Sequence, residues 1–263
     1  MVTGYPKSKT WRSRAARCLT EAAGNPKTMA SAITSIVSDL LDQVPCPPTD
    51  LSAIERKVGV YSCVAEDIAG SGELRRDESG LRIVYSCHLP RPRRRFTIAH
   101  ELAHAYFETC WPGLPGPSKE VEQLCDMMAA EILMPSAHVL ELIKGGLRLE
   151  QVFEIARTFD VSLSASAIRC ANLKSVTVFE VNGGRVTWGS GSVRRGSVSK
   201  LSEGLQSVVF TATAGQRGED QLFFDSETGL RPWRVEYQAI GKNRALLLLQ
   251  PYSARSGFIA ASP

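Results

Sequence analysis

The sequence has little of what disulfide-stabilised and membrane-spanning proteins need. Its seven cysteines are an odd number and form no CxxC pair, so neither a disulfide framework nor a zinc knuckle is predicted. Reduced thiols are the ordinary state of cysteine in the cytoplasm. No apolar run approaches the length of about 18 residues that would cross a bilayer, and no apolar signal segment follows the basic N-terminus. We therefore expect a soluble cytoplasmic protein without a membrane partner.

The sequence also lacks a Gly-rich phosphate loop, an internal repeat and a strong charge imbalance. The net charge of +4 over 263 residues is too small to indicate nucleic-acid binding by itself. Basic residues nevertheless gather in two places, an N-terminal arm over residues 1–27 and a run of arginines at 91–95. Such clusters are most often solvated surfaces. The alternative is a contact with DNA or with an acidic protein.

The order of the predicted elements indicates an α+β protein. Apolar residues at helical spacing predict a helix over 29–41, and Asp50 is a suitable N-cap for a short helix that follows. Residues 60–64 and 81–85 alternate as strands, from which we expect a small antiparallel sheet. Residues 136–174 are predicted as three helices that resemble a helix-turn-helix, although such units often serve only for packing.

The composition changes after residue 174. Asn182-Gly183-Gly184 between two apolar segments is a strong hairpin pattern. Further strands are predicted at residues 205–213, 221–224, 233–240 and 244–250. We expect residues 175–263 to form a separate, mainly β domain.

The candidate chemistry begins with His100 and His104. Residues four apart on a helix differ by about 400° of rotation and about 6 Å of rise, so both imidazoles face the same way and can bind one metal ion. Glu101 is offset from His100 by about 100°, which places its carboxylate beside the metal and not on it. That position suits a general base that acts on water. We expect this helix to begin near Thr97.

A catalytic zinc ion needs a third protein ligand and one open position. His88 and His138 have no readable ligand context. The next helix offers carboxylates, and Glu122 and Asp126 lie on its inward stripe, among small and apolar neighbours.

Glu131 lies about 180° from Glu122 around that helix, so we expect it to face water. Glu122 is thus the best third ligand. Asp126 could accept the ring N–H of His100 or His104 and fix the ligating tautomer.

Two segments resemble the ImmA/IrrE family of zinc metallopeptidases: RRRFTIAHELAH at 93–104 and EQLCDMMAAEILMP at 122–135. The resemblance covers roughly residues 30–135 and continues more loosely to 173. It departs from the family at Ala103, where members usually have glycine, and we expect little effect because alanine is small and a better helix former. The spacing of Glu122 and Asp126 also resembles thermolysin-like zinc peptidases.

The resemblance implies a zincin-like zinc metallopeptidase domain over 28–135, followed by the helix-turn-helix-like unit 136–174. It implies an endopeptidase with Zn²⁺ as cofactor that cleaves a helix-turn-helix repressor and derepresses stress-response or mobile-element genes. By positional analogy, the domain 175–263 could be sensory. The alternative function is a DNA-binding transcriptional regulator with a structural zinc site, which is possible but not favoured.

Overall fold

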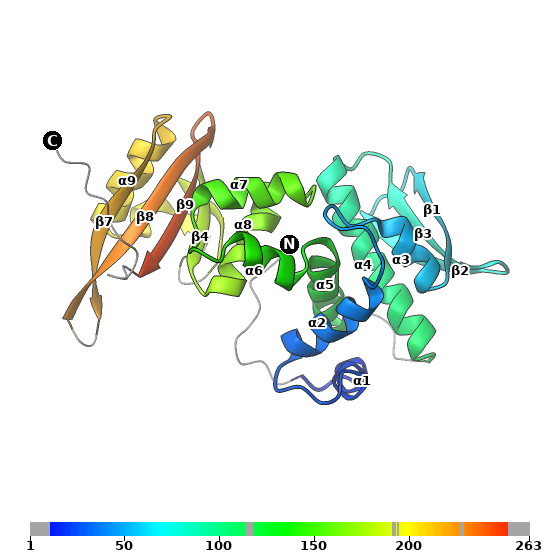
Figure 1. Ribbon diagram of the computed structural model, residues 1–263. Helices are drawn as coiled ribbons and strands as arrows, with labels where there is room; N and C mark the ends of the chain where they lie inside the picture. Colours follow the sequence, from blue (N-terminus) through cyan, green and yellow to red (C-terminus); the bar gives the residue numbers. More distant parts are fainter. Residues whose placement is uncertain (1–10, 114–117, 191–192, 194, 227–228, 252–263) are drawn as a thin grey trace. The chain divides into compact units, whose positions relative to one another are not determined.

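The computed structural model describes residues 11–113, 118–190, 193, 195–226 and 229–251. Helices and two β-sheets make up this part of the chain, so the predicted α+β class is confirmed (Figure 1). The chain divides into two compact units. Unit 1 comprises Met1–Gly145 and Gln151–Arg169, and unit 2 comprises Gly146–Glu150 and Cys170–Pro263. Within the described residues, no helix has both the length and the apolar character to cross a membrane.

Unit 1 holds the predicted metal-binding residues. In chain order its elements are α1 (Arg14–Ala22), α2 (Met29–Leu40), α3 (Leu51–Lys57), β1 (Val60–Glu66), β2 (Gly72–Asp77), β3 (Gly80–Ser86), α4 (Arg91–Cys110), α5 (Lys119–Leu133), α6 (Ser136–Leu142), and most of α7 (Leu149–Thr158) and α8 (Leu163–Lys174). The helices predicted at 29–41 and after Asp50 are therefore confirmed, as are the three helices within 136–174.

The sheet of unit 1 is mixed, with the order β1-β3-β2. We expected an antiparallel sheet, and this was wrong for β1, which pairs in parallel with β3. The reason is β2, a charged strand that lies between them in the chain but pairs antiparallel with β3 at the edge of the sheet. Charged side chains are common on edge strands because they discourage pairing with other proteins.

Helix α4 begins at Arg91 and not near Thr97 as expected. Pro90 is extended and Pro92 stands in the first turn, where proline costs no hydrogen bond. The arginine run is therefore the start of this helix. Arg91 Nε and Arg95 Nε lie 2.7 Å and 3.5 Å from Asp160 Oδ2. These two arginines thus form ion pairs within unit 1, so the arginine cluster 91–95 is not merely a solvated surface.

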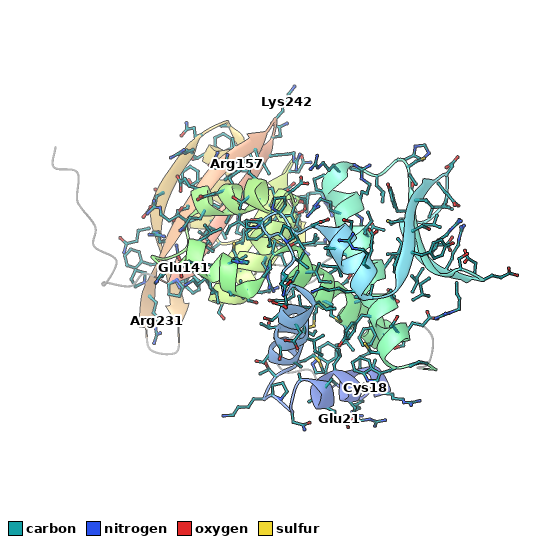
Figure 2. The ribbon with its side chains drawn as sticks, turned by 45° about the vertical axis from the view of Figure 1, so that its right-hand side comes forward. Cys18, Glu21, Glu141, Arg157, Arg231 and Lys242 are labelled. Atoms are coloured by element: carbon teal, nitrogen blue, oxygen red, sulfur yellow. The ribbon has the colours of Figure 1, made fainter. Side chains whose placement is uncertain are left out.

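The basic arm predicted over 1–27 contains a folded helix, while residues 1–10 lie outside the described residues. Helix α1 buries Ala15, Ala16 and Leu19, and Figure 2 shows Glu21 on the same helix, where it is exposed. The carboxylate of Glu120, at the start of α5, accepts the N–H of Ser13 at 2.6 Å. This bond ties the first turn of α1 to the helix that carries Glu122.

The expectation that Glu131 faces water was wrong, because its residue is only 4% exposed. Helix α5 is covered on all sides near its end, and every residue from 127 to 133 is buried. The Glu131 carboxylate accepts hydrogen bonds from Ser136 N and Ser136 Oγ, both at 2.8 Å, and forms an ion pair with Arg169 of α8. Arg169 Nε also donates to Met134 O at 3.0 Å. A carboxylate on the side of α5 opposite the predicted metal ligand Glu122 thus has its charge balanced by an arginine inside the protein.

Unit 2 is built on a six-stranded antiparallel sheet with the order β6-β5-β4-β9-β8-β7. Its elements are β4 (Thr177–Asn182), β5 (Arg185–Gly189), β6 (Gly196–Ser197), the short 3-10 helix η1 (Val198–Lys200), α9 (Glu203–Thr213), β7 (Arg217–Ser226), β8 (Gly229–Gly241) and β9 (Arg244–Pro251). The predicted hairpin is confirmed, and Gly183 and Gly184 both have positive φ, as its tight turn requires.

The strand predicted at 205–213 was wrong, since these residues belong to helix α9. Its β-branched residues favour strands, but the buried set Leu205, Val208, Val209 and Ala212 follows the spacing i, i+3, i+4, i+7 of a helix face. That face packs with inward residues of the sheet such as Phe179 and Leu247. Helical periodicity therefore outweighed local strand propensity.

Candidate metal centre

Two buried helices position the predicted metal-binding residues. Helix α4 carries His100, Glu101 and His104, and α5 carries Glu122 and Asp126. The inward positions of both helices are small: Ala99 and Ala103 on α4 and Cys125 and Ala129 on α5 are all 0% exposed. Small side chains let helix backbones approach closely. Polar groups projecting from two such helices can then meet over a short distance.

Three potential metal ligands lie together at this place. His100 Nε2 lies 3.2 Å from both His104 Nε2 and Glu122 Oε2, and His104 Nε2 lies 3.3 Å from Glu122 Oε1. Donor atoms bound tetrahedrally to zinc at about 2.0–2.2 Å are about 3.3–3.6 Å apart. The donor set of two imidazoles and one carboxylate therefore fits a zinc ion in both chemistry and spacing. The role of these three residues as ligands stays a prediction.

Asp126 is paired with His100. Asp126 Oδ1 lies 3.0 Å from His100 Nδ1, so a proton held on Nδ1 leaves the lone pair of Nε2 free toward the other two donors. Carboxylates that accept the second ring N–H of a ligating histidine fix the ring in this way. The sequence alone left His104 as an equal candidate for this contact.

The electrostatic setting distinguishes the two imidazoles. Burial lowers the pKa of His100, but the hydrogen bond and charge of Asp126 outweigh it and raise the pKa above its usual value. Burial and the neighbouring charge of His100 lower the pKa of His104. Their side chains are only 16% and 18% exposed. The negative charges of Asp126 and Glu122 on α5 thus offset the cost of placing a positive charge in this buried site.

The side chain of Glu101 extends from α4 toward the edge strand β2. Its residue is 8% exposed, and the backbone N–H of Leu74 lies near enough to its carboxylate to favour the charged form. Burial raises the pKa of Glu101, and the charge of His100 opposes this shift. Gly72 of β2 passes so close to α4 that an added Cβ would overlap Thr97 Cγ2. The sequence gives no clear strand pattern for β2, because four of its six residues are charged.

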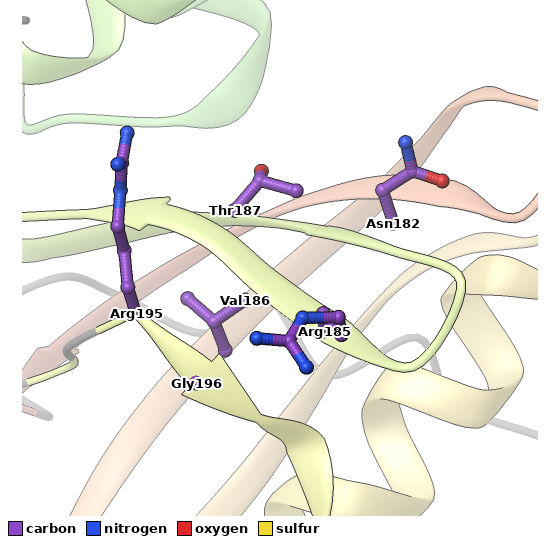
Figure 3. Close-up of a pocket in the computed structure, with 6 residues that line it drawn as sticks. All are labelled: Asn182, Arg185, Val186, Thr187, Arg195 and Gly196. Atoms are coloured by element: carbon purple, nitrogen blue, oxygen red, sulfur yellow. The ribbon is translucent and has the colours of Figure 1, made fainter.

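A separate hollow lies in unit 2. It is lined by Val186, Gly196 and the polar side chains drawn in Figure 3, namely Asn182, Arg185, Thr187 and Arg195. None of the predicted site residues belongs to it. Two arginines around an open surface do not provide acid–base or metal chemistry, so we place the candidate centre on α4 and α5.

Comparisons with known proteins concern the fold and the family that the chain resembles. No curated protein matches the chain significantly. Among solved structures, a Mycobacterium tuberculosis transcriptional regulator is similar in fold, with a TM-score of 0.52, 15% sequence identity, and coverage of 90% of this chain and 80% of that one. Residues 57–171, which include all five residues of the candidate centre, match the family model described as Peptidase_M78, the IrrE N-terminal-like domain.

Proposed function

We propose that this protein is a zinc-dependent endopeptidase. The single observation that carries the proposal is that His100 Nε2 and His104 Nε2 lie 3.2 Å apart, and each lies 3.2–3.3 Å from one of the two Glu122 carboxylate oxygens. The match of residues 57–171 to a peptidase family supports it. When bound there, zinc would supply Lewis acidity toward a peptide carbonyl and toward water.

Glu101 would act as the general base. It would take a proton from the attacking water and deliver it to the leaving amine. Burial raises the pKa of this carboxyl group, which makes it a better proton acceptor than an exposed glutamate. Asp126 would be a positioning residue that orients the imidazole of His100.

The edge strand β2 is suited to bind the substrate backbone. Among the described strands it pairs only with β3, so the N–H and C=O groups of its second edge, other than the N–H of Leu74, can pair with an extended peptide. The backbone N–H of Leu74, a residue of this strand, lies near the Glu101 carboxylate. A peptide added along β2 would therefore pass beside the general base. An extended segment of another protein is therefore the substrate class that fits.

A helix-turn-helix repressor is the substrate implied by the family resemblance. Cleavage of such a repressor would derepress the stress-response or mobile-element genes under its control. The alternative, DNA binding through α7 and α8, has less support. The only arginine of α8, Arg169, is buried in its ion pair with Glu131, so this side chain is not available to contact DNA.

The proposal is tested by co-expressing the full chain with repressors encoded near it and following repressor size on a gel. The wild type should contain one zinc ion at this centre and shorten one repressor. Glu101→Gln should keep that zinc but lose cleavage. Glu108→Gln, a change on the exposed part of the same helix, is the matched control and should cleave normally. Normal cleavage by Glu101→Gln would rule out this mechanism.

A further inference from the structure

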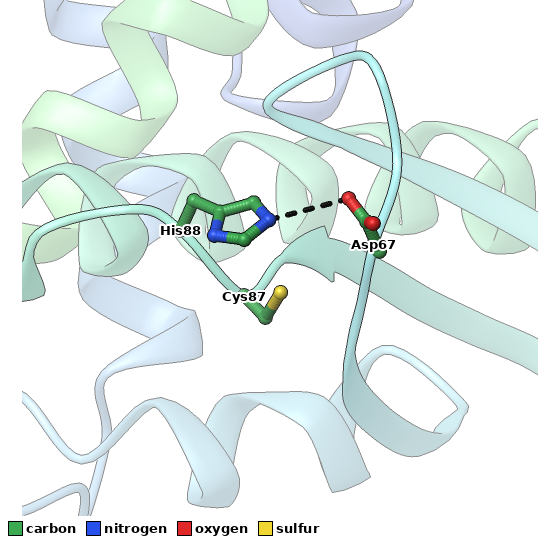
Figure 4. Close-up of side chains that lie close together, drawn as sticks. All are labelled: Asp67, Cys87 and His88. Atoms are coloured by element: carbon green, nitrogen blue, oxygen red, sulfur yellow. Dashed lines mark hydrogen bonds and ion pairs between the residues drawn. The ribbon is translucent and has the colours of Figure 1, made fainter.

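Three potential metal ligands lie together beyond the ends of β1 and β3. One comes from the segment after β1, and the other two are adjacent residues after β3. Asp67 follows β1, and Cys87 and His88 follow β3 (Figure 4). One ligand atom from each lies within 4.8 Å of the other two. His88 Nε2 is 3.3 Å from Asp67 Oδ1. None of the three residues belongs to the centre on α4 and α5.

The backbone brings these side chains together. Because β1 and β3 run in parallel with Glu66 opposite Ser86, both strands end at the same edge of the sheet. The N–H of Cys87 donates to Glu66 O at 3.0 Å, which extends the pairing beyond the strands. The N–H of Leu89 donates to Ser86 O at 3.3 Å, so Cys87 and His88 form the centre of a tight turn. Hydrogen bonds of the main chain thus hold together the backbone segments that carry the three side chains.

The nearby arginines pair with Glu66 and not with Asp67. The neighbouring carboxylate of Glu66 is held by Arg75 at 3.0 Å and by Arg82 at 2.6 Å. In the ion pairs of the described residues, Asp67 takes part only in the one with His88. The side chains of His88 and Asp67 are 73% and 86% exposed, and Cys87 is also exposed. Water can therefore complete a coordination sphere.

We propose that Asp67, Cys87 and His88 form a second site, on the surface, for a divalent metal ion that prefers thiolate and imidazole ligands, such as zinc. A thiolate selects zinc and similar ions over magnesium and calcium. Bond lengths of about 2.0–2.3 Å place tetrahedral donors about 3.3–3.8 Å apart, so the side chains need to move by about 1 Å. Exposed side chains do this by small rotamer changes. A bound ion would connect the segment after β1 to the turn that leads into α4.

Cobalt is the appropriate probe, because its thiolate complexes absorb in the near ultraviolet. Titration of Co²⁺ into the reduced full-length protein should produce this charge-transfer band, and zinc should abolish it by competition. Cys87→Ser should remove the band. His88→Ala and Asp67→Asn should each weaken cobalt binding by about tenfold or more, since one of three protein ligands is lost.

Two controls separate this site from other thiols and from the centre on α4 and α5. Cys110→Ser changes another exposed cysteine and should leave the band intact. His100→Ala should also leave it intact, because the proposed ligands of the first centre include no thiol. Circular dichroism verifies that each surface variant is folded. The proposal is overturned if the wild type gives no band, if Cys87→Ser retains it, or if neither His88→Ala nor Asp67→Asn weakens it.

Discussion

The buried ion pair between Glu131 and Arg169 gives a quantitative test of how unit 1 is held together. Both side chains are nearly inaccessible, at 6% and 5% exposure. Arg169→Met would leave a buried carboxylate with only the two hydrogen bonds from Ser136. Removing one partner of a buried pair typically costs about 3–5 kcal/mol. For a domain of this size, a loss of that magnitude lowers the melting temperature by about 6–20 °C.

The double variant Glu131→Met/Arg169→Met should be less destabilised than either single variant. Well-packed apolar residues often replace a buried ion pair at little cost, because the desolvation penalty of both charges disappears. The coupling energy from the double-mutant cycle should therefore be large and favourable. Melting curves from circular dichroism, recorded in the presence of a chelator, provide the measurement free of any contribution from bound metal.

The matched control is the exposed pair of Arg76 and Glu108, whose side chains are 59% and 41% accessible. Arg76→Met should cost no more than about 1 kcal/mol, because water screens surface pairs. If Arg169→Met melts within the range of this control, or if the double variant is worse than both single variants, the assignment of Glu131 as a neutralised interior carboxylate is refuted.

Three further predictions concern the candidate centre. Asp126→Asn should weaken zinc binding by about 10–100-fold, measured by competition with a chelating dye, because a neutral amide holds the His100 ring less well. Gly72→Ala should cost about 1–3 kcal/mol in a urea titration and reduce cleavage, since its Cβ would push β2 away from Thr97; undiminished stability and activity would contradict the close approach. Ala103→Gly should cost about 0.5–1 kcal/mol with cleavage retained, because glycine is the poorer helix former; complete loss of cleavage would show that the methyl group has a further role.

Much of the fold was readable from local patterns. Helix spacing and caps predicted the helix after Asp50 and the helices of residues 136–174, and Asn182-Gly183-Gly184 predicted the hairpin. These features depend on neighbours within a few residues, which the sequence contains directly. The errors at residues 205–213 and in the sheet of unit 1 have a different origin. Strand propensity is a weak guide when a segment packs its apolar face on a sheet, and strand pairing depends on partners far along the chain.

The candidate centre illustrates the same division. The spacing of His100, Glu101 and His104, together with helix geometry, determined that two imidazoles share a face with a carboxylate beside them. The helical spacing of the next segment placed Glu122 and Asp126 on its inward face, which made them the candidate third ligand and its neighbour. The pairing of Asp126 with His100 and the inward turn of Glu131 to Arg169 become visible only in the folded structure.

The physical reason is the range of the interactions. A helix repeats every few residues, so one segment of sequence already determines which of its side chains share a face. Which face of a helix is buried, and which charged groups pack against it, depends on elements that come close to the helix only when the chain folds. The meeting of Asp67 with Cys87 and His88 depends on the parallel pairing of β1 and β3. No local pattern records that pairing. Local spacing therefore indicates the first set of candidate ligands, whereas the second set comes together only in the folded chain.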